Sequence, residues 1–223
     1  MKKIVFLGCC WHFKRFSKLA CDLGYEIVGI IDDHYYGNTL IHEGIPIIQS
    51  EKNIVEFLSL CSSDIEFFIS TPLLMRDTIV HTKRLRMIDI VNTHDLPCVN
   101  LIDPFSSIGV DVVLGKGIFL APFSVVQDGA RLDDHVWVQE FGFVGHDSKV
   151  GTGTSLSVKA YLGSTNIIGK NSLIGINSCV IHRMAEPVTI GDNSMTHPGV
   201  ILMDDLGSNL EACINRTVKP RPF

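Results

Sequence analysis

His146 and Asp147 are adjacent residues whose types suit acid–base chemistry. They lie in the segment Val-Gly-His-Asp-Ser, which occupies 144–148. An imidazole takes up a proton near neutral pH, and a carboxylate beside it fixes its tautomer and supports its cationic form. The pair therefore predicts a general base, although the carboxylate could also come from elsewhere in the chain. The alternatives are an ordinary surface histidine and a different base, His135, which stands in a weaker sequence context.

A six-residue repeat sets the position of this pair. Period six fits neither an amphipathic helix nor a simple half-buried strand. It fits a parallel β-helix, in which three short strands make one triangular coil and the aliphatic side chains of successive coils stack into a column. His146 comes two residues after an aliphatic position, at a bend, so its side chain should project outward. The aliphatic positions are Ile102, Ile108, Leu114, Leu120, Val126, Leu132, Val138, Val144, Val150, Leu156, Leu162, Ile168, Ile174 and Val180.

Glycine often follows the aliphatic residue, as in Gly109, Gly145 and Gly163. We expect these glycines to supply backbone conformations at the bends that a Cβ would hinder. The repeat predicts roughly four to five coils over this stretch, since three hexads make one coil. A surface loop is predicted at 182–187, after which the pattern resumes at Ile190, Thr196 and Leu202.

The first part of the chain has a different pattern, in which apolar strands alternate with helical segments. Such alternation predicts a small α/β domain with a Rossmann-like parallel sheet at 1–95. The all-β domain formed by the parallel β-helix follows at 96–223. The segment 35–44 has the composition of a loop. The predicted strands are 2–7, 26–31, 45–48 and 65–70, and the predicted helices are 13–23, 53–60 and 72–86.

Composition excludes several classes of protein. The chain has 223 residues, a net charge of −5 and 46% hydrophobic residues, and its pI is about 6.0. An acidic chain without a basic cluster is not typical of a nucleic-acid binder. No apolar run reaches the roughly 18 residues of a membrane span. The seven cysteines are scattered without a C-x-x-C pair, which indicates reduced thiols in a cytoplasmic protein and neither a disulfide framework nor a zinc site.

Gly8 follows the first strand, where a dinucleotide fingerprint would begin. The later glycines of G-x-G-x-x-G are replaced by Cys10 and Phe13. A bulky side chain there would keep a pyrophosphate from the backbone. A ligand at this turn is therefore expected to be a sugar, a nucleotide base or a single phosphate.

The chain resembles a known group of enzymes in two segments and in its overall plan. The plan is an α/β part joined to hexapeptide repeats, with Gly-His-Asp at 145–147 and Ile-Gly-Ile-Asn-Ser-Cys-Val at 174–180. It is similar to the left-handed β-helix sugar acyltransferases of the sialic-acid O-acetyltransferase and UDP-amino-sugar N-acetyltransferase type, and the similarity covers nearly the whole chain. Departures from the family pattern lie in the first turn, where only Gly8 and His12 match, and at Gln139, where relatives have Asn.

The resemblance implies a set of site residues. His146 would be the catalytic base and Asp147 its acidic neighbour. Coenzyme A would lie in a groove between adjacent prisms, and a backbone N–H near Ser164 would stabilise the tetrahedral oxyanion. The implied cofactor contacts are Ser155, Ser164, Gly175, Ile176 and Asn177, and the implied acceptor contacts are Gly8, Cys9, Cys10, His12, Asp32, Asp33 and Gln139.

The resemblance also implies an activity. It predicts an acetyl-CoA-dependent acetyltransferase that acts on an amino sugar, nucleotide-linked, in bacterial surface-glycan biosynthesis, as a cytoplasmic homotrimer with no metal and no membrane insertion. Two alternatives remain open. One is O-acetylation of a sialic-acid-like sugar or transfer from another acyl donor, and the other is a non-catalytic β-helix that serves as a scaffold or binding protein.

Overall fold

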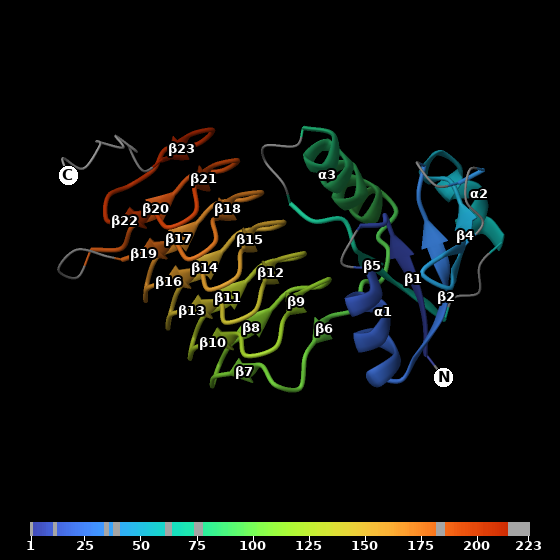
Figure 1. Cartoon of the computed structure of the whole chain (residues 1–223), viewed down its shortest axis with the longest axis horizontal. Helices are drawn as coiled ribbons and strands as arrows, with labels where there is room; N and C mark the ends of the chain where they lie inside the picture. Colours follow the sequence, from blue (N-terminus) through green and yellow to red (C-terminus); the bar gives the residue numbers. More distant parts are fainter. Residues whose placement is uncertain are drawn as a thin grey trace, which may run out of the picture.

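An α/β sheet and a prism of short strands lie side by side in this protein (Figure 1). The structure is a computed structural model and describes residues 2–10, 13–33, 36–37, 41–60, 64–73, 78–181 and 186–213. The sheet is built from the N-terminal part of the chain, and the prism begins at β6 (Leu101–Ile102). The predicted fold class is confirmed, namely an α/β part followed by a left-handed parallel β-helix.

The α/β part has one sheet with the strand order β3-β4-β2-β1-β5. Its central strand β1 pairs in parallel with β2 on one side and with β5 on the other, as predicted. The strands are β1 (Lys2–Leu7), β2 (Tyr25–Ile31), β3 (Ile41–His42), β4 (Ile45–Gln49) and β5 (Ile65–Ile69). The helices are α1 (Phe13–Asp22), the short 3₁₀ helix η1 (Glu51–Asn53), α2 (Ile54–Leu60) and α3 (Thr78–Thr93).

Two details of this part differ from the sequence-based prediction. Strand β3 lies within the predicted loop 35–44 and pairs antiparallel with β4, so the sheet is mixed. The hairpin is possible because Glu43 and Gly44 both have positive φ, at 50° and 82°, as a tight two-residue turn requires. Helix α3 continues past the predicted end at 86 to Thr93, and residues 74–77 of the predicted helix lie outside the described part of the chain.

Alternating side chains of the sheet build two separate cores. Ile4 and Phe6 of β1 pack with α1 and with the first coils of the prism. Val5 and Leu7, on the opposite side of β1, pack with α3. Period-two alternation in a strand sends successive side chains to opposite faces, so one strand joins both layers.

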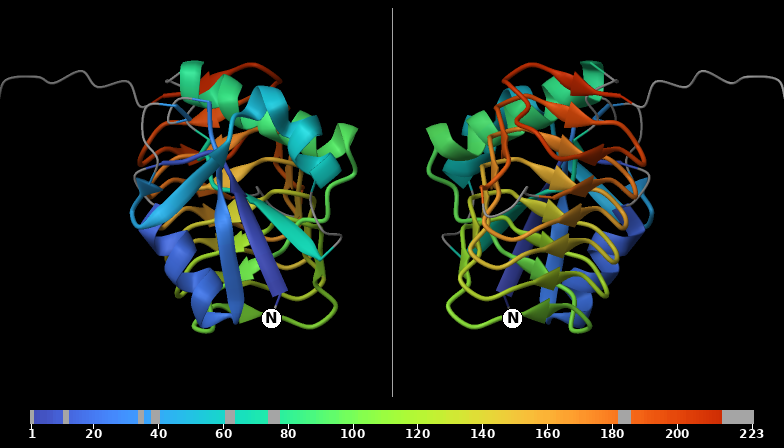
Figure 2. Two further views of the ribbon diagram at one scale, coloured as in Figure 1. Left: turned by 90° about the vertical axis from the view of Figure 1, so that its right-hand side faces the viewer. Right: turned by 90° about the vertical axis from the view of Figure 1, so that its left-hand side faces the viewer.

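The prism consists of two-residue strands that form three parallel sheets. Figure 2 shows its coils stacked one above another, in chain order from green to red. We call these sheets face 1, face 2 and face 3. Face 1 contains β6 (Leu101–Ile102), β9 (Phe119–Leu120), β12 (Trp137–Val138), β15 (Ser155–Leu156), β18 (Leu173–Ile174), β21 (Met195–Thr196) and β23 (Glu211–Ala212). Face 2 contains β7 (Ser107–Ile108), β10 (Val125–Val126), β13 (Phe143–Val144), β16 (Tyr161–Leu162), β19 (Cys179–Val180) and β22 (Ile201–Leu202). Face 3 contains β8 (Val113–Leu114), β11 (Arg131–Leu132), β14 (Lys149–Val150), β17 (Ile167–Ile168) and β20 (Thr189–Ile190).

The aliphatic column predicted from the hexads fills the prism. Val138, Val144 and Val150 are at most 1% exposed and belong to one continuous core. The resumed pattern after the interruption is also confirmed, because Ile190 and Thr196 end β20 and β21. Of the predicted loop at 182–187, residues 182–185 lie outside the described part of the chain.

The glycines that follow the aliphatic residues have a different role from the one predicted. They do not have positive φ; the left-handed residues come two positions later, as at Asp111, Phe123 and Asp147. The glycines are needed for space, because a Cβ on Gly145 would lie 2.4 Å from the Ser164 nitrogen of the next coil. Stacking of the coils therefore excludes side chains at these positions.

Face 1 of the prism packs against the α/β part. Trp137 lies in the aromatic cluster of Phe16 and Phe119, with ring centroids 5.1 and 5.7 Å away. Arg84 of α3 is fully buried there, donates to the carbonyls of Thr71 and His135, and lies 4.4 Å from the Trp137 ring. Burial lowers the pKa of Arg84 to about 9.

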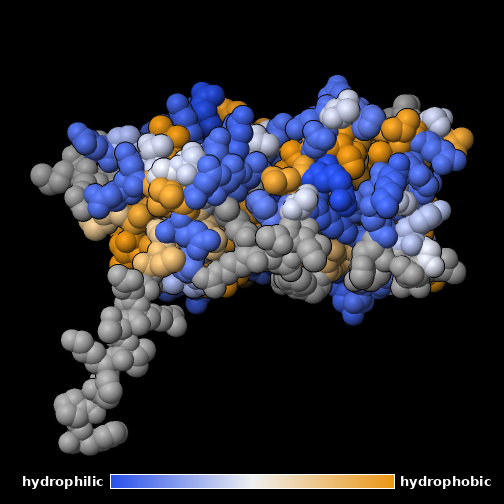
Figure 3. All heavy atoms as spheres, turned by 90° about the horizontal axis from the view of Figure 1, so that it is seen from above, coloured by the Kyte–Doolittle hydropathy of each residue, from blue (hydrophilic) through white to orange (hydrophobic). Residues whose placement is uncertain are grey.

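The outer surface is more hydrophilic than the buried contact between the two parts (Figure 3). Seen from above, hydrophilic side chains cover much of both parts, and hydrophobic ones lie in spots between them (Figure 3). Among the described residues, no helix combines the length and apolar character needed to cross a bilayer.

Candidate functional site

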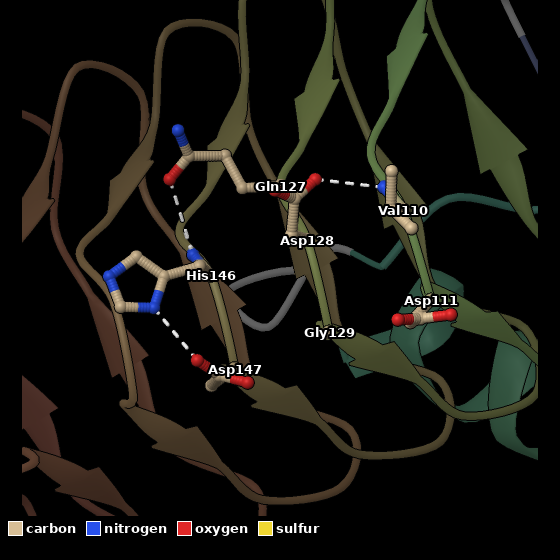
Figure 4. Close-up of a pocket in the computed structure, with 7 residues that line it drawn as sticks. All are labelled: Val110, Asp111, Gln127, Asp128, Gly129, His146 and Asp147. Atoms are coloured by element: carbon tan, nitrogen blue, oxygen red, sulfur yellow. Dashed lines mark hydrogen bonds and ion pairs between the residues drawn. The ribbon is translucent and has the colours of Figure 1, made fainter.

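His146 lies at the corner between faces 2 and 3, in an open hollow of about 560 Å³ (Figure 4). Strand β13 ends at Val144, and the tight bend that follows turns the His146 side chain outward. That side chain is 54% exposed, as its position in the hexad predicts. The hollow is lined by Val110, Asp111, Gln127, Asp128, Gly129, His146 and Asp147.

His146 and Asp147 do pair with each other. The Nδ1 atom of His146 lies 2.9 Å from Oδ2 of Asp147 (Figure 4). An ionised carboxylate can only accept a hydrogen bond, so in the neutral imidazole the proton sits on Nδ1. The lone pair is then on Nε2, on the other side of the ring, where a substrate proton could be accepted.

The preceding coil holds this pair in place. The Asp147 N–H donates to the carbonyl of Asp128 at 3.0 Å, and the His146 N–H donates to Oε1 of Gln127 at 3.2 Å. Gly129 leaves room for the carboxylate, because a Cβ there would lie 2.5 Å from Oδ1 of Asp147. Asp147 itself has a φ of 57°, a conformation that Asp tolerates better than most residues.

Ser164 occupies the same corner one coil further on. Thr165 donates to the carbonyl of His146 at 2.8 Å, which ties the two coils together. At this corner the amides of Val110 and His146 are capped by the side chains of Asp128 and Gln127. Within the described residues, the Ser164 amide has no hydrogen-bond acceptor.

Other predicted residues lie at the corner between faces 1 and 2. Gly175 is buried, and its N–H donates to Oγ1 of Thr196 at 2.9 Å. Ile176 is 52% exposed, and Asn177 is exposed with a φ of 55°. Gln139 is half-buried at this same corner, one strand before His146. These residues and His146 flank opposite edges of face 2, so one chain does not bring them together.

Two candidate residues, Ser155 and His135, are buried inside the protein. Ser155 is 1% exposed on face 1, and its hydroxyl has no partner among the described residues. Ser155 was expected to contact the acyl donor, but in this structure its side chain is buried. His135 is fully buried, and burial, with a smaller contribution from Arg84, lowers its pKa to about 4. A neutral, enclosed imidazole does not serve as the exposed base.

The turn after β1 contains the first group of predicted acceptor residues. Gly8 has a φ of 81°, and a Cβ on it would lie 1.9 Å from Oγ1 of Thr71. Cys10 packs in the core, and Cys9 is half-buried. Burial, with a contribution from Asp32, raises the pKa of Cys9 to about 12, so its thiol stays protonated. His12 lies outside the described residues.

Asp32 and Asp33 belong to a network of charges at the end of β2. Asp32 is fully buried and pairs with Lys83 at 2.5 Å. Asp33 accepts from the Ser50 hydroxyl at 2.5 Å. Burial acts to raise the pKa of Asp33, but its bonds to Ser50 and Lys52 and the charge of Arg86 outweigh this and hold the pKa below its ordinary value. Sequence reasoning missed Lys83 and Arg86 because they come from α3, far along the chain.

Comparison with known proteins shows the fold. The family model for the hexapeptide repeat of succinyl-transferase matches residues 165–203. The bifunctional protein GlmU of Maricaulis maris is 30% identical over 84 residues, which are 37% of this chain and only 18% of that protein.

Solved structures resemble the chain over nearly its full length. The perosamine N-acetyltransferase of Caulobacter crescentus, solved as a point mutant, has a TM-score of 0.78 at 18% identity, covering 96% of this chain and 94% of that one. The acetyltransferase domain of PglB from Neisseria gonorrhoeae has a TM-score of 0.78 at 22% identity, covering 99% and 100%. WeeI from Acinetobacter baumannii has a TM-score of 0.76 at 15% identity, covering 94% and 95%. The chain thus has the fold of these proteins, a hexapeptide-repeat β-helix preceded by an α/β sheet.

Proposed function

We propose that this protein is an acetyl-CoA-dependent acetyltransferase that acts on an amino sugar, nucleotide-linked, with His146 as its general base. The observation that carries the proposal is the His146–Asp147 pair, exposed at a prism corner with its Nε2 side open. The similar Caulobacter crescentus structures are complexes with CoA and GDP-perosamine, and the PglB domain was also solved with acetyl coenzyme A. The acetylated sugar would be used in bacterial surface-glycan biosynthesis.

The site can perform direct acyl transfer. The acceptor amine attacks the thioester carbonyl, and a C–N bond forms while Nε2 of His146 takes the amine proton. Asp147 supports the imidazolium that results. The Ser164 N–H donates to the tetrahedral oxygen, a contact worth roughly 2.7–4 kcal/mol in other enzymes. Collapse breaks the C–S bond, and the coenzyme A thiolate takes the proton back from His146.

The proposal includes a homotrimer. Face 2 carries outward apolar side chains, among them Tyr161 at 40% and Ile201 at 66% exposure, and Phe143 and Tyr161 stack at 4.8 Å. A threefold arrangement with face 2 toward the axis covers these side chains. It also sets the His146 corner of one chain against the Gln139 corner of the next.

This arrangement gives the remaining predicted residues a role. The neighbouring chain supplies Gln139 for the acceptor and Gly175, Ile176 and Asn177 for coenzyme A, which lies in the groove between the two prisms. Ser155 is left out because it is only 1% exposed on face 1. The segment 1–95 binds the acceptor, and 96–223 forms the acyltransferase domain.

The direct test is an acetyl-transfer assay with the His146→Ala variant. Nucleotide-linked amino sugars and sialic acids are screened with acetyl-CoA, and release of the free thiol is measured. We expect transfer to an amine acceptor and a fall in kcat of about 10²–10⁴ in the variant, as for loss of a general base. Its stability should stay within roughly 0.5 kcal/mol of the parent, because an exposed side chain is removed.

His94→Ala is the matched control, since His94 is an exposed histidine away from the hollow. Full activity in His146→Ala would refute the assignment of the base. Transfer to a hydroxyl, or from another acyl donor only, would replace the N-acetylation proposal with the corresponding alternative.

A further inference from the structure

A cluster of three potential metal ligands lies at the C-terminal end of face 1, away from the proposed active-site hollow. His197 follows β21, and Glu211 and Cys213 belong to the last strand and the residue after it. Strand β23 pairs in parallel with β21, and the His197 N–H donates to the carbonyl of Ala212 at 2.9 Å. Coil stacking therefore sets side by side residues that form no motif in the sequence.

Two contacts among the described residues of this cluster share one atom. Nε2 of His197 lies 2.7 Å from Oε2 of Glu211 and 3.3 Å from Sγ of Cys213. The three ligand atoms lie within 4.8 Å of one another. One ring nitrogen carries either a proton or a lone pair, so it cannot donate to the carboxylate and accept from the thiol at once.

This geometry argues against a catalytic cysteine. In a nucleophile–histidine–carboxylate relay, the nucleophile and the carboxylate use different ring nitrogens. Here both partners face the same nitrogen. A cation in place of the shared proton would satisfy an imidazole nitrogen, a carboxylate oxygen and a thiolate together.

We propose that His197, Glu211 and Cys213 bind a Zn²⁺ ion, with water as the fourth ligand. Mixed nitrogen, oxygen and sulfur donors suit zinc, whereas Ca²⁺ and Mg²⁺ prefer oxygen ligands alone. Bond lengths of about 2.0–2.3 Å in a tetrahedron require ligand atoms roughly 3.3–3.7 Å apart. The Glu211 oxygen and the Cys213 sulfur must then move away from Nε2 by roughly 0.6 and 0.3 Å and lie within roughly 3.7 Å of each other. Their exposed side chains allow this.

The ion would fasten the last strand of the prism. β23 is the edge strand of face 1, and an exposed edge is otherwise open to fraying or to pairing with another chain. A bridge from His197 to Cys213 closes the loop between them and pins β23 to β21. The predicted role is structural, and zinc binding should raise the melting temperature.

The test uses the full chain, stripped of metal by a chelator and then titrated with Zn²⁺ or Co²⁺. We expect one ion per chain, a thiolate-to-cobalt charge-transfer absorption, and a zinc-dependent rise in melting temperature. Cys213→Ser should lose the cobalt absorption and the temperature rise, and Glu211→Gln should weaken binding at least tenfold. Both replace exposed side chains, so the fold is kept.

Cys21→Ser is the matched control, because Cys21 is another exposed free cysteine. It should bind cobalt with the spectrum of the parent. The proposal is overturned if the parent binds no stoichiometric zinc, if its cobalt complex lacks thiolate absorption, or if Cys213→Ser binds as the parent does.

Discussion

At the scale of the residue, the bond between His146 and Asp147 determines which ring nitrogen is available to a substrate. Because Nδ1 faces the carboxylate at 2.9 Å, Nε2 is the atom that can take a proton. The sequence left this pairing open, since the carboxylate partner of His146 could also have come from elsewhere in the chain. The bend after β13 and the left-handed conformation of Asp147 turn both side chains to one side.

His135 leads to a prediction about acid stability. Its folded pKa is about 4, against 6.5 for the free imidazole, chiefly because of burial. The unfolded chain therefore takes up a proton that the folded chain refuses as pH falls below 6.5. The contribution of neutral His135 to the free energy of unfolding is fully present above pH 6.5. It decreases as the pH falls to about 4, by roughly 3 kcal/mol in total.

The measurement is the free energy of unfolding in denaturant between pH 7.5 and pH 4, an interval chosen to span roughly both pKa values. His135→Asn should lose this part of the pH dependence, since Asn tolerates the left-handed φ of 60° at this position. His94→Ala should retain it. An unchanged slope in His135→Asn would show that the histidine is not the source.

At the scale of the element, the coils are built from a repeat that the sequence shows only in part. The aliphatic column was predictable because large apolar side chains recur at a fixed spacing and can be buried only in the interior of the prism. The left-handed corner positions were not, because Asp111, Phe123 and Phe141 occupy them in place of glycine. A role for the amide near Ser164 came only from the family resemblance, because the sequence does not show which acceptors the neighbouring coils offer to this amide.

Gly129 connects coil stacking to the proposed chemistry. Ala at this position would need a φ near its present 66° and would bring a Cβ to 2.5 Å from Oδ1 of Asp147. The carboxylate can rotate away, so we expect the protein to fold with a loss of about 1–3 kcal/mol from backbone strain. The His146 contact should be lost, with a lower kcat and an altered pH–rate profile.

Gly24→Ala is the control for strain alone. Gly24 has a φ of 85°, and a Cβ there would meet nothing within 4 Å. It should lose stability while keeping the kinetic parameters. Equal kcat values for Gly129→Ala and the parent would mean that Asp147 does not position His146.

At the scale of the whole molecule, the α/β part and the prism are joined through buried contacts of several kinds. Phe16 and Trp137 share one aromatic core, and Arg84 donates to carbonyls from both parts. The sequence predicted both parts but not this junction, because Arg84 looks like any helical surface residue. The outward side of face 2 carries exposed apolar side chains, such as Tyr161 and Ile201, that the proposed trimer would cover.

Tyr161→Glu tests the trimer. A carboxylate at the centre of face 2 would be buried without a partner, which costs several kcal/mol. We expect the variant to be a monomer by light scattering and to lose most acetyl transfer. Thr189→Glu adds the same charge to the exposed face 3 and should remain trimeric. A parent protein that is an active monomer would contradict the proposal.

The register of the coils limits how this chain can change in length. Trp137 pairs with Ser155, and corner contacts such as Lys116 to Asp134 also span 18 residues. An insertion or deletion of one whole coil would lengthen or shorten the prism and leave every later residue on its own face. A change of one hexad would keep the aliphatic column but rotate all that follows by one face, which would move every later corner out of alignment with the coils before it. Viable length variants of this protein should therefore differ by whole coils, or carry their extra residues in a corner loop.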